Sequence, residues 1–140
     1  MVCTGSFRVR APAGRVFPLV TPEGERAWVP EWSPEWIHPA DGTLQEGGVF
    51  RTQHGGEETI WMILACDPQA GHVRYVRDTP GSRIGVVDVV LRESAGVTEV
   101  TVTYTLTALS EEGRARLVAF VARYEAMLSE WEEGIGRFAC

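Results

Sequence analysis

The chain has 140 residues and a formal net charge of −6, from 13 basic and 19 acidic side chains. This length predicts a single domain over residues 1–140 with one sizeable core. An acidic chain without a basic patch is not expected to bind nucleic acid or anionic membranes. All basic residues are arginine, a bacterial-type composition, and the absence of lysine excludes Schiff-base catalysis and a lysine general base.

The rare reactive side chains are scattered. Cys3, Cys66 and Cys140 form no CxxC pair, and the three histidines lack metal-ligand spacing, so we expect no disulfide framework and no metal. No glycine motif for a nucleotide is present, and we expect no cofactor. With no signal peptide and no apolar run long enough for a bilayer, we expect a cytoplasmic protein without membrane insertion.

The first elements in chain order are a strand and two short helices. Residues 3–10 alternate apolar and polar side chains, which predicts a strand. Pro12 suits the start of a short helix, which Pro18 should end, and a second helical piece is expected over residues 22–27.

The run WVPEWSPEW then places Trp28, Trp32 and Trp36 within nine residues. Pro30 and Pro34 exclude a regular helix and favour extended backbone. Three such large rings need apolar surface to cover. Two interpretations stay open: the segment forms the wall of a hydrophobic cavity, or it packs as an ordinary part of the core.

Five strands are predicted next, over residues 48–54, 57–66, 72–79, 83–92 and 97–108, and their short connections make them antiparallel neighbours. A long helix over residues 111–137 follows, with Ser110 as its N-cap. Its apolar stripe should lie against the dry face of the sheet and comprises Leu117, Phe120, Val121, Tyr124, Leu128, Trp131, Ile135 and Phe138.

Turn lengths assign the face of each strand residue. We take Gly55-Gly56 and Pro80-Gly81 as two-residue turns and residues 94–96 as a three-residue loop. The predicted inward face is then Phe50, Thr52, His54, Trp61, Ile63, Val73, Tyr75, Arg77, Ile84, Val86, Asp88, Val102, Tyr104 and Leu106. Arg77 and Asp88 would form an ion pair or anchor a polar ligand group, and the inward tyrosines would bind a ligand or cap core polar atoms.

This order of elements resembles the SRPBCC superfamily, also called START-like. The stretches that carry the resemblance are APAGRVFPLVTPEGERAWVPEW, GGVFRT, ETIWMILACDPQAGHVRYVR and VTEVTVTYTLTALSEEG with the final helix. The superfamily includes polyketide cyclases and dehydratases, plant pathogenesis-related allergens and chaperone-ATPase activators. The resemblance implies an α+β helix-grip fold: an antiparallel sheet of six or seven strands around a long C-terminal helix, with two short helices after the first strand.

The expected function is binding of a small, largely hydrophobic molecule, such as a lipid, between sheet and helix, by a monomer or homodimer. The expected ligand-binding residues are Trp28, Trp32, Trp36, Trp61, Tyr75, Arg77, Asp88, Tyr104 and Tyr124. One alternative is an enzyme of the polyketide cyclase/dehydratase type, with Asp88 or His54 as acid or base. Another is a protein-binding module of the chaperone-ATPase-activator type, which predicts an exposed apolar patch.

Overall fold

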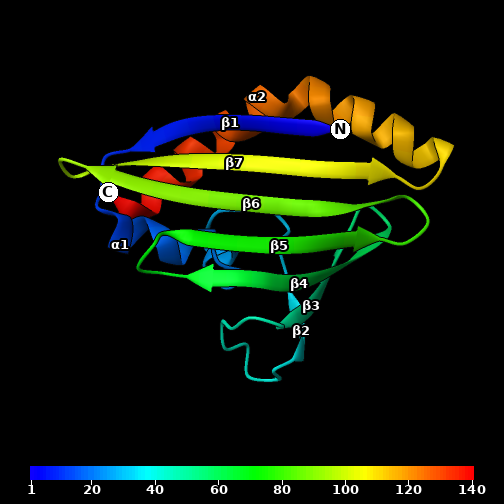
Figure 1. Ribbon diagram of the computed structural model, residues 1–140, viewed down its shortest axis with the longest axis horizontal. Coiled ribbons are helices and arrows are strands. Elements are labelled where there is room, and N and C mark those ends of the chain that lie inside the picture. The colour runs from blue at the N-terminus through cyan, green and yellow to red at the C-terminus, as the bar shows by residue number, and fades with distance from the viewer.

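A seven-stranded antiparallel sheet and one long helix dominate the computed structural model, which describes all 140 residues (Figure 1). The strands are β1 (Val2–Val9), β2 (Glu35–His38), β3 (Val49–His54), β4 (Glu57–Asp67), β5 (His72–Thr79), β6 (Arg83–Ser94) and β7 (Val97–Ala108). The helices are α1 (Ala13–Val16), the 3₁₀ turns η1 (Phe17–Val20) and η2 (Gly24–Ala27), and α2 (Glu111–Ala139). The strand order is β1-β7-β6-β5-β4-β3-β2.

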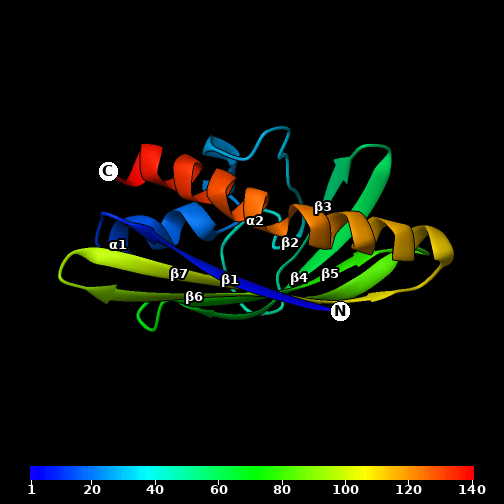
Figure 2. The same cartoon turned by 90° about the horizontal axis from the view of Figure 1, so that it is seen from above.

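Helix α2 crosses the inner face of the sheet on the side of β1 and β7 (Figure 2). The β3–β4 hairpin bends out of the plane of the other strands toward the same side as the helix. This arrangement confirms the helix-grip fold, with the short helices after the first strand. Helix α2 contacts only the β1 and β7 side of the inner face. The apolar side chains on the inner face of β3 to β6 are therefore left to pack against other parts of the chain. No helix of the chain is both long and apolar enough to cross a membrane.

The beginning of α2 follows the expected capping chemistry. Ser110 Oγ accepts a hydrogen bond from the Gly113 backbone N–H at 3.0 Å, and two glutamates occupy the first turn. The buried stripe is narrower than predicted, because Val121 and Phe138 are about half exposed. Its buried members include Leu117, Tyr124, Leu128 and Ile135. One face of α2 therefore packs against the sheet, and the side chains at the edges of the stripe are exposed.

The tryptophan segment, residues 28–36, joins η2 to the sheet. It starts as a turn in which Glu31 has a φ of 63°, and it forms a strand only from Glu35 onward. Its end forms β2, a short edge strand that the sequence did not predict, with Trp36 paired to Phe50. Helix α1 ends at Val16, before Pro18 as expected, and Pro18 then lies in the first turn of η1, where a proline fits.

The pairing of β6 corrects the predicted register. Thr79 pairs with Arg83, so the turn at Pro80-Gly81 contains three residues, and Ser94 pairs with Val97, so the next turn contains only two. The two-residue turn requires positive φ at both positions, and Ala95 adopts 53° although alanine rarely does. The predicted lengths of both loops are therefore wrong by one residue.

These two errors cancel at β7 and leave only β6 reversed. Val102, Tyr104 and Leu106 point inward as predicted, and all three are buried. In β6, the inward residues are Val87, Val89 and Leu91, each at most 4% exposed. The prediction that Ile84, Val86 and Asp88 point inward is wrong, because successive strand residues face opposite sides.

Candidate functional site

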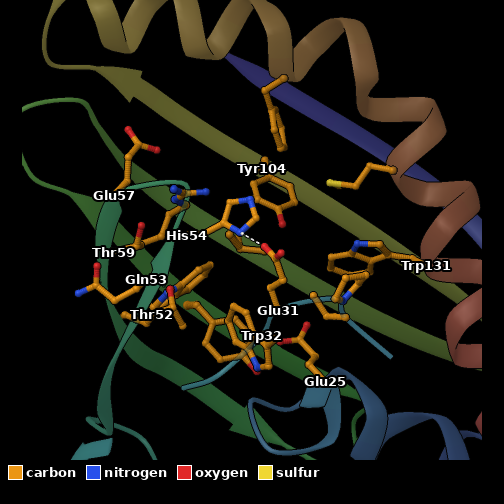
Figure 3. A pocket seen from close by; sticks show the side chains of 18 of the residues that line it. Glu25, Glu31, Trp32, Thr52, Gln53, His54, Glu57, Thr59, Tyr104 and Trp131 are labelled. Atoms are coloured by element: carbon orange, nitrogen blue, oxygen red, sulfur yellow. Dashed lines mark hydrogen bonds and ion pairs between the residues drawn. The ribbon is translucent and has the colours of Figure 1, made fainter. Parts of the chain in front are cut away.

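A cavity of about 420 Å³ lies between the inner face of the sheet, α2 and the tryptophan segment. Figure 3 shows side chains from η2, the tryptophan segment, the β3–β4 hairpin, β7 and α2 converging on this space. Its lining comprises Glu25, Trp28, Val29, Pro30, Glu31, Trp32, Phe50, Thr52, Gln53, His54, Glu57, Thr59, Trp61, Tyr75, Arg77, Arg83, Val87, Val89, Tyr104, Phe120, Met127, Glu130 and Trp131. The volume falls within the range of small-molecule sites.

Aromatic rings form most of the apolar wall. Trp28 meets Trp131 of α2 edge to face, with ring centroids 5.4 Å apart, and Trp32 meets Trp61 of β4 in the same way at 5.6 Å. Trp61 in turn stacks on Phe50, with ring centroids 5.8 Å apart. These contacts connect the segment both to the sheet and to the helix, so the rings hold the cavity open as a rigid wall.

The indole N–H groups of the wall are mostly occupied by the protein itself. Trp28 donates to the carbonyl of Leu19 at 2.8 Å, and Trp32 donates to the carbonyl of Pro22 at 2.8 Å. Trp61 donates to Thr52 Oγ1 at 3.0 Å. These three rings therefore offer a ligand apolar surface and no hydrogen bond. Trp131, by contrast, makes no hydrogen bond to the protein through its indole N–H.

Arg77 is the cation of the cavity floor. Its side chain extends from β5 over the Trp61 ring, with Cζ 5.5 Å from the ring centroid, and Nη2 donates to Thr79 Oγ1 at 2.9 Å. Nε is buried without a partner, and no carboxylate forms an ion pair with the guanidinium. Burial lowers the pKa of Arg77 below its ordinary value. The residue remains a cation, since the ordinary pKa of arginine is so high.

Other charged groups of the lining have partners. Glu57 receives two hydrogen bonds of 3.1 Å from Arg83, which hold the pKa of its carboxyl below the ordinary range. Glu31 lies 3.5 Å from Nδ1 of His54, and Glu130 accepts from Arg123 at 2.9 Å. His54 and Glu31 are each 77% exposed, so this pair lies at the solvent side of the cavity (Figure 3).

Glu25 is the exception among the carboxylates. It comes from η2, and its side chain lies beside Trp32 at the edge of the cavity in Figure 3. Burial alone raises the pKa of this carboxyl well above its ordinary value of 4.5, and no cation counteracts the shift. This shift is toward the neutral form, in which a carboxyl is a hydrogen-bond donor as well as an acceptor.

The two tyrosines of the floor differ in what their hydroxyl groups do. Tyr75 donates to the carbonyl of Val20 at 3.0 Å, so it caps a core polar atom and leaves only its ring for the cavity. Tyr104 makes no hydrogen bond to the protein, and its hydroxyl points into the open space in Figure 3. Burial raises the pKa of Tyr104, which keeps the hydroxyl protonated as a donor.

Three expected site residues lie elsewhere. Asp88 faces outward on β6, where its Oδ1 is 2.6 Å from Nε2 of His72, so the predicted pair with Arg77 does not exist. Trp36 packs on Phe50 behind the lining and donates to Glu23 at 2.9 Å. Tyr124 lies between α2 and β7, and its hydroxyl donates to the carbonyl of Val102 at 2.6 Å.

Several lining residues were not predicted as site residues. Glu25 lies in a single 3₁₀ turn, which is too short for any periodicity that would assign its direction. Phe120 and Trp131 belong to the predicted apolar stripe of α2, and both line the cavity. A distinction between core and cavity needs the sheet curvature, which no local pattern encodes.

The chain offers little for a metal. No group of three or more histidine, cysteine, aspartate or glutamate side chains is gathered closely enough to hold an ion. All three cysteines are free thiols. The lining itself combines an aromatic wall with a few hydrogen-bonding groups.

No protein-family model matches the sequence, and no curated protein matches it. Solved structures match over nearly the whole chain. CalU16 from Micromonospora echinospora is 22% identical with a TM-score of 0.68, over 96% of this chain and 75% of that one. Ara h 8.0201 is 14% identical with a TM-score of 0.69, over 96% and 97% of the two chains. The Aha1 dimer from Colwellia psychrerythraea is 14% identical with a TM-score of 0.67, over 97% and 98%. The chain therefore shares the helix-grip fold of these solved structures.

Proposed function

We propose that the protein binds a small, largely hydrophobic molecule in the cavity between the sheet and α2. The observation that carries this proposal is the aromatic wall of Trp28, Trp32, Trp61 and Trp131 around about 420 Å³. A core that needed these rings only for packing would enclose no such volume, since protein interiors are close-packed. The polar groups in the lining are few, as expected of a site that orients an apolar ligand.

Two neutral probes test the proposal: methyl 2-naphthylacetate and methyl decanoate, titrated against the intrinsic tryptophan fluorescence. We expect saturable binding, and native mass spectrometry of freshly purified protein should show a retained hydrophobic molecule. Val87→Phe places a ring on the cavity floor and should weaken probe binding about tenfold or more, as expected when apolar contacts are displaced. The matched control is Val86→Phe, one residue away on the outer face, which should leave binding unchanged. Equal binding by both variants would contradict the proposal.

An enzyme of the polyketide cyclase/dehydratase type is the second proposal for the same cavity. Its support is the Glu25 carboxyl, whose raised pKa suits a general acid or base in an apolar site. His54 remains a candidate at the cavity mouth, whereas Asp88 faces away from it. Turnover of aromatic polyketide substrates by Glu25→Gln, His54→Ala and Asp88→Asn tests this role. Loss of turnover with Glu25→Gln or His54→Ala but not with Asp88→Asn would support it, and unchanged turnover in all three would contradict it.

A protein-binding role of the chaperone-ATPase-activator type is the weakest of the proposals. Met62, Leu64 and Ile84 are exposed on the outer face of the sheet. Charged residues interrupt this surface, however: Asp78 lies between Ile60 and Ile84 across the strands. The larger aromatic surfaces face the cavity instead, which favours binding of a small molecule over binding of a protein.

A further inference from the structure

Three hydrogen-bond donors of the cavity lining have no partner within the protein. Arg77 has a buried Nε without a partner, Tyr104 has a free hydroxyl, and Trp131 has a free indole N–H. They come from β5, β7 and α2, three elements that enclose the same space. A site that leaves donors unpaired selects ligand groups that accept hydrogen bonds, because an unsatisfied buried donor is costly.

The charges of the lining lead to the same conclusion. Glu57 and Glu130 each accept hydrogen bonds from an arginine, and Glu31 lies beside His54 at the exposed side. Among the cations, Arg83 is held by Glu57. Arg77 therefore remains as the cation without a carboxylate partner, beside the aromatic ring of Trp61, and low local polarity strengthens an interaction with an anion.

Glu25 does not supply the missing partner. Its carboxyl forms no ion pair with Arg77, and burial favours its neutral form. Gly85, which pairs with Arg77 on β6, carries no side chain that could cover the guanidinium. A Cβ at this position would come within 1.9 Å of the Thr105 carbonyl oxygen, so the backbone of β7 leaves no room for a side chain at Gly85.

We propose that the ligand of the cavity is an apolar molecule with a carboxylate, which binds Arg77 and accepts a hydrogen bond from Tyr104 while its apolar body lies against the tryptophan wall. This inference rests on the proposed ligand-binding function and adds the charge of the ligand to it. A guanidinium and a hydroxyl directed at one carboxylate give charge-assisted hydrogen bonds, which are about twice as strong as neutral ones. A protonated Glu25 would tolerate such an anion, whereas an ionised one would repel it.

The test compares three head groups on two apolar bodies at neutral pH. The probes are 2-naphthylacetate, its methyl ester and 2-(2-naphthyl)ethylammonium, with decanoate, methyl decanoate and decylammonium as the aliphatic series. We expect each carboxylate to bind about tenfold or more tightly than its ester, as charge-assisted hydrogen bonds imply. The series that binds more tightly then distinguishes an aromatic from an aliphatic acid.

Arg77→Met should reduce the preference for the carboxylate to about twofold or less while the ester still binds, since only the charged interaction is lost. Arg74→Met, on the outer face of the same strand, is the matched control and should keep the full preference. Arg77→Gln repeats the test with a polar side chain should the methionine variant fold poorly. Equal binding of ester and carboxylate, or a preference for the ammonium, overturns this inference but leaves ligand binding intact. Absence of binding by every probe overturns both.

Discussion

The guanidinium of Arg77 lies over the Trp61 ring at 5.5 Å from its centroid, and no carboxylate balances its charge. A cation–π contact returns part of the interaction energy that the cation loses on leaving water, but it does not replace an ion pair. A side chain in this position is better explained by what it binds than by what it adds to the stability of the fold.

Replacement of Arg77 by methionine should therefore stabilise the ligand-free protein. Met fills similar volume beside Trp61, and Thr79 keeps its hydrogen bond with Thr59, so no polar group is left unpaired. We expect the free energy of unfolding in urea to rise by about 1 kcal/mol, as on removal of other buried charges. Arg74→Met on the outer face should change it by less than about 0.5 kcal/mol. A clear loss of stability with Arg77→Met would show that the guanidinium has a structural role.

Glu25 and Glu23 should give pH dependences of opposite sign although they are two residues apart. The folded pKa of Glu25 is raised, so its contribution is most favourable below about pH 4.5 and is lost as pH rises through the folded pKa. Glu25→Gln should consequently raise the melting temperature at neutral pH and leave it almost unchanged in acid.

Glu23 accepts hydrogen bonds from Trp36 and Arg26, which lower the pKa of its carboxyl. Its contribution is present above about pH 4.5 and is lost as pH falls through the lowered folded pKa. Glu23→Gln should thus lower the melting temperature at neutral pH, with the difference disappearing in acid. Thermal unfolding of both variants from pH 3 to pH 8 provides the comparison, and parallel curves would refute the assignment.

Much of this structure can be predicted from local patterns, and the wrong direction of the β6 side chains comes from the lengths of two turns. The alternation in β7 and the inward position of Tyr104 follow from periodicity, and the β3–β4 register follows from the Gly55-Gly56 turn. The side of the sheet on which Asp88 lies cannot be predicted in this way, because it depends on whether a turn has two or three residues. A change of one residue in the turn moves every side chain of the strand to the opposite face of the sheet. Ala95 has an unusual positive φ that composition does not reveal.

The places of the candidate site residues depend on tertiary structure. Arg77 and Trp61 line the cavity, whereas Tyr124 lies where α2 contacts β7 and its hydroxyl donates to the carbonyl of Val102. The apolar residues of α2 have the same spacing of three and four residues beside the cavity and beside the core. What separates cavity from core is the distance between helix and sheet, a tertiary quantity that a sequence pattern does not contain.

Asp88 and His72 should tolerate substitution because the pair is partly exposed on the outer face, with side chains 27% and 33% accessible. Asp88→Asn should change the free energy of unfolding by about 1 kcal/mol or less, as expected of partly exposed ion pairs. It should leave the affinity for methyl 2-naphthylacetate unchanged. A loss of probe binding without a loss of stability would instead place Asp88 in functional contact with the cavity.

Two glycines of α2 provide a test of the wall itself. A Cβ at Gly134 would lie 2.8 Å from Cε3 of Trp28, whereas a Cβ at Gly136 would meet nothing within 4 Å. Gly136→Ala should raise the free energy of unfolding by up to about 1 kcal/mol through helix propensity alone. Gly134→Ala should lower it, since overpacking of about 1–3 kcal/mol exceeds that gain. Displacement of Trp28 should also alter tryptophan fluorescence and weaken binding of methyl 2-naphthylacetate. If both alanine variants are equally stable and bind the probe alike, the contact between Trp28 and α2 does not define the cavity wall.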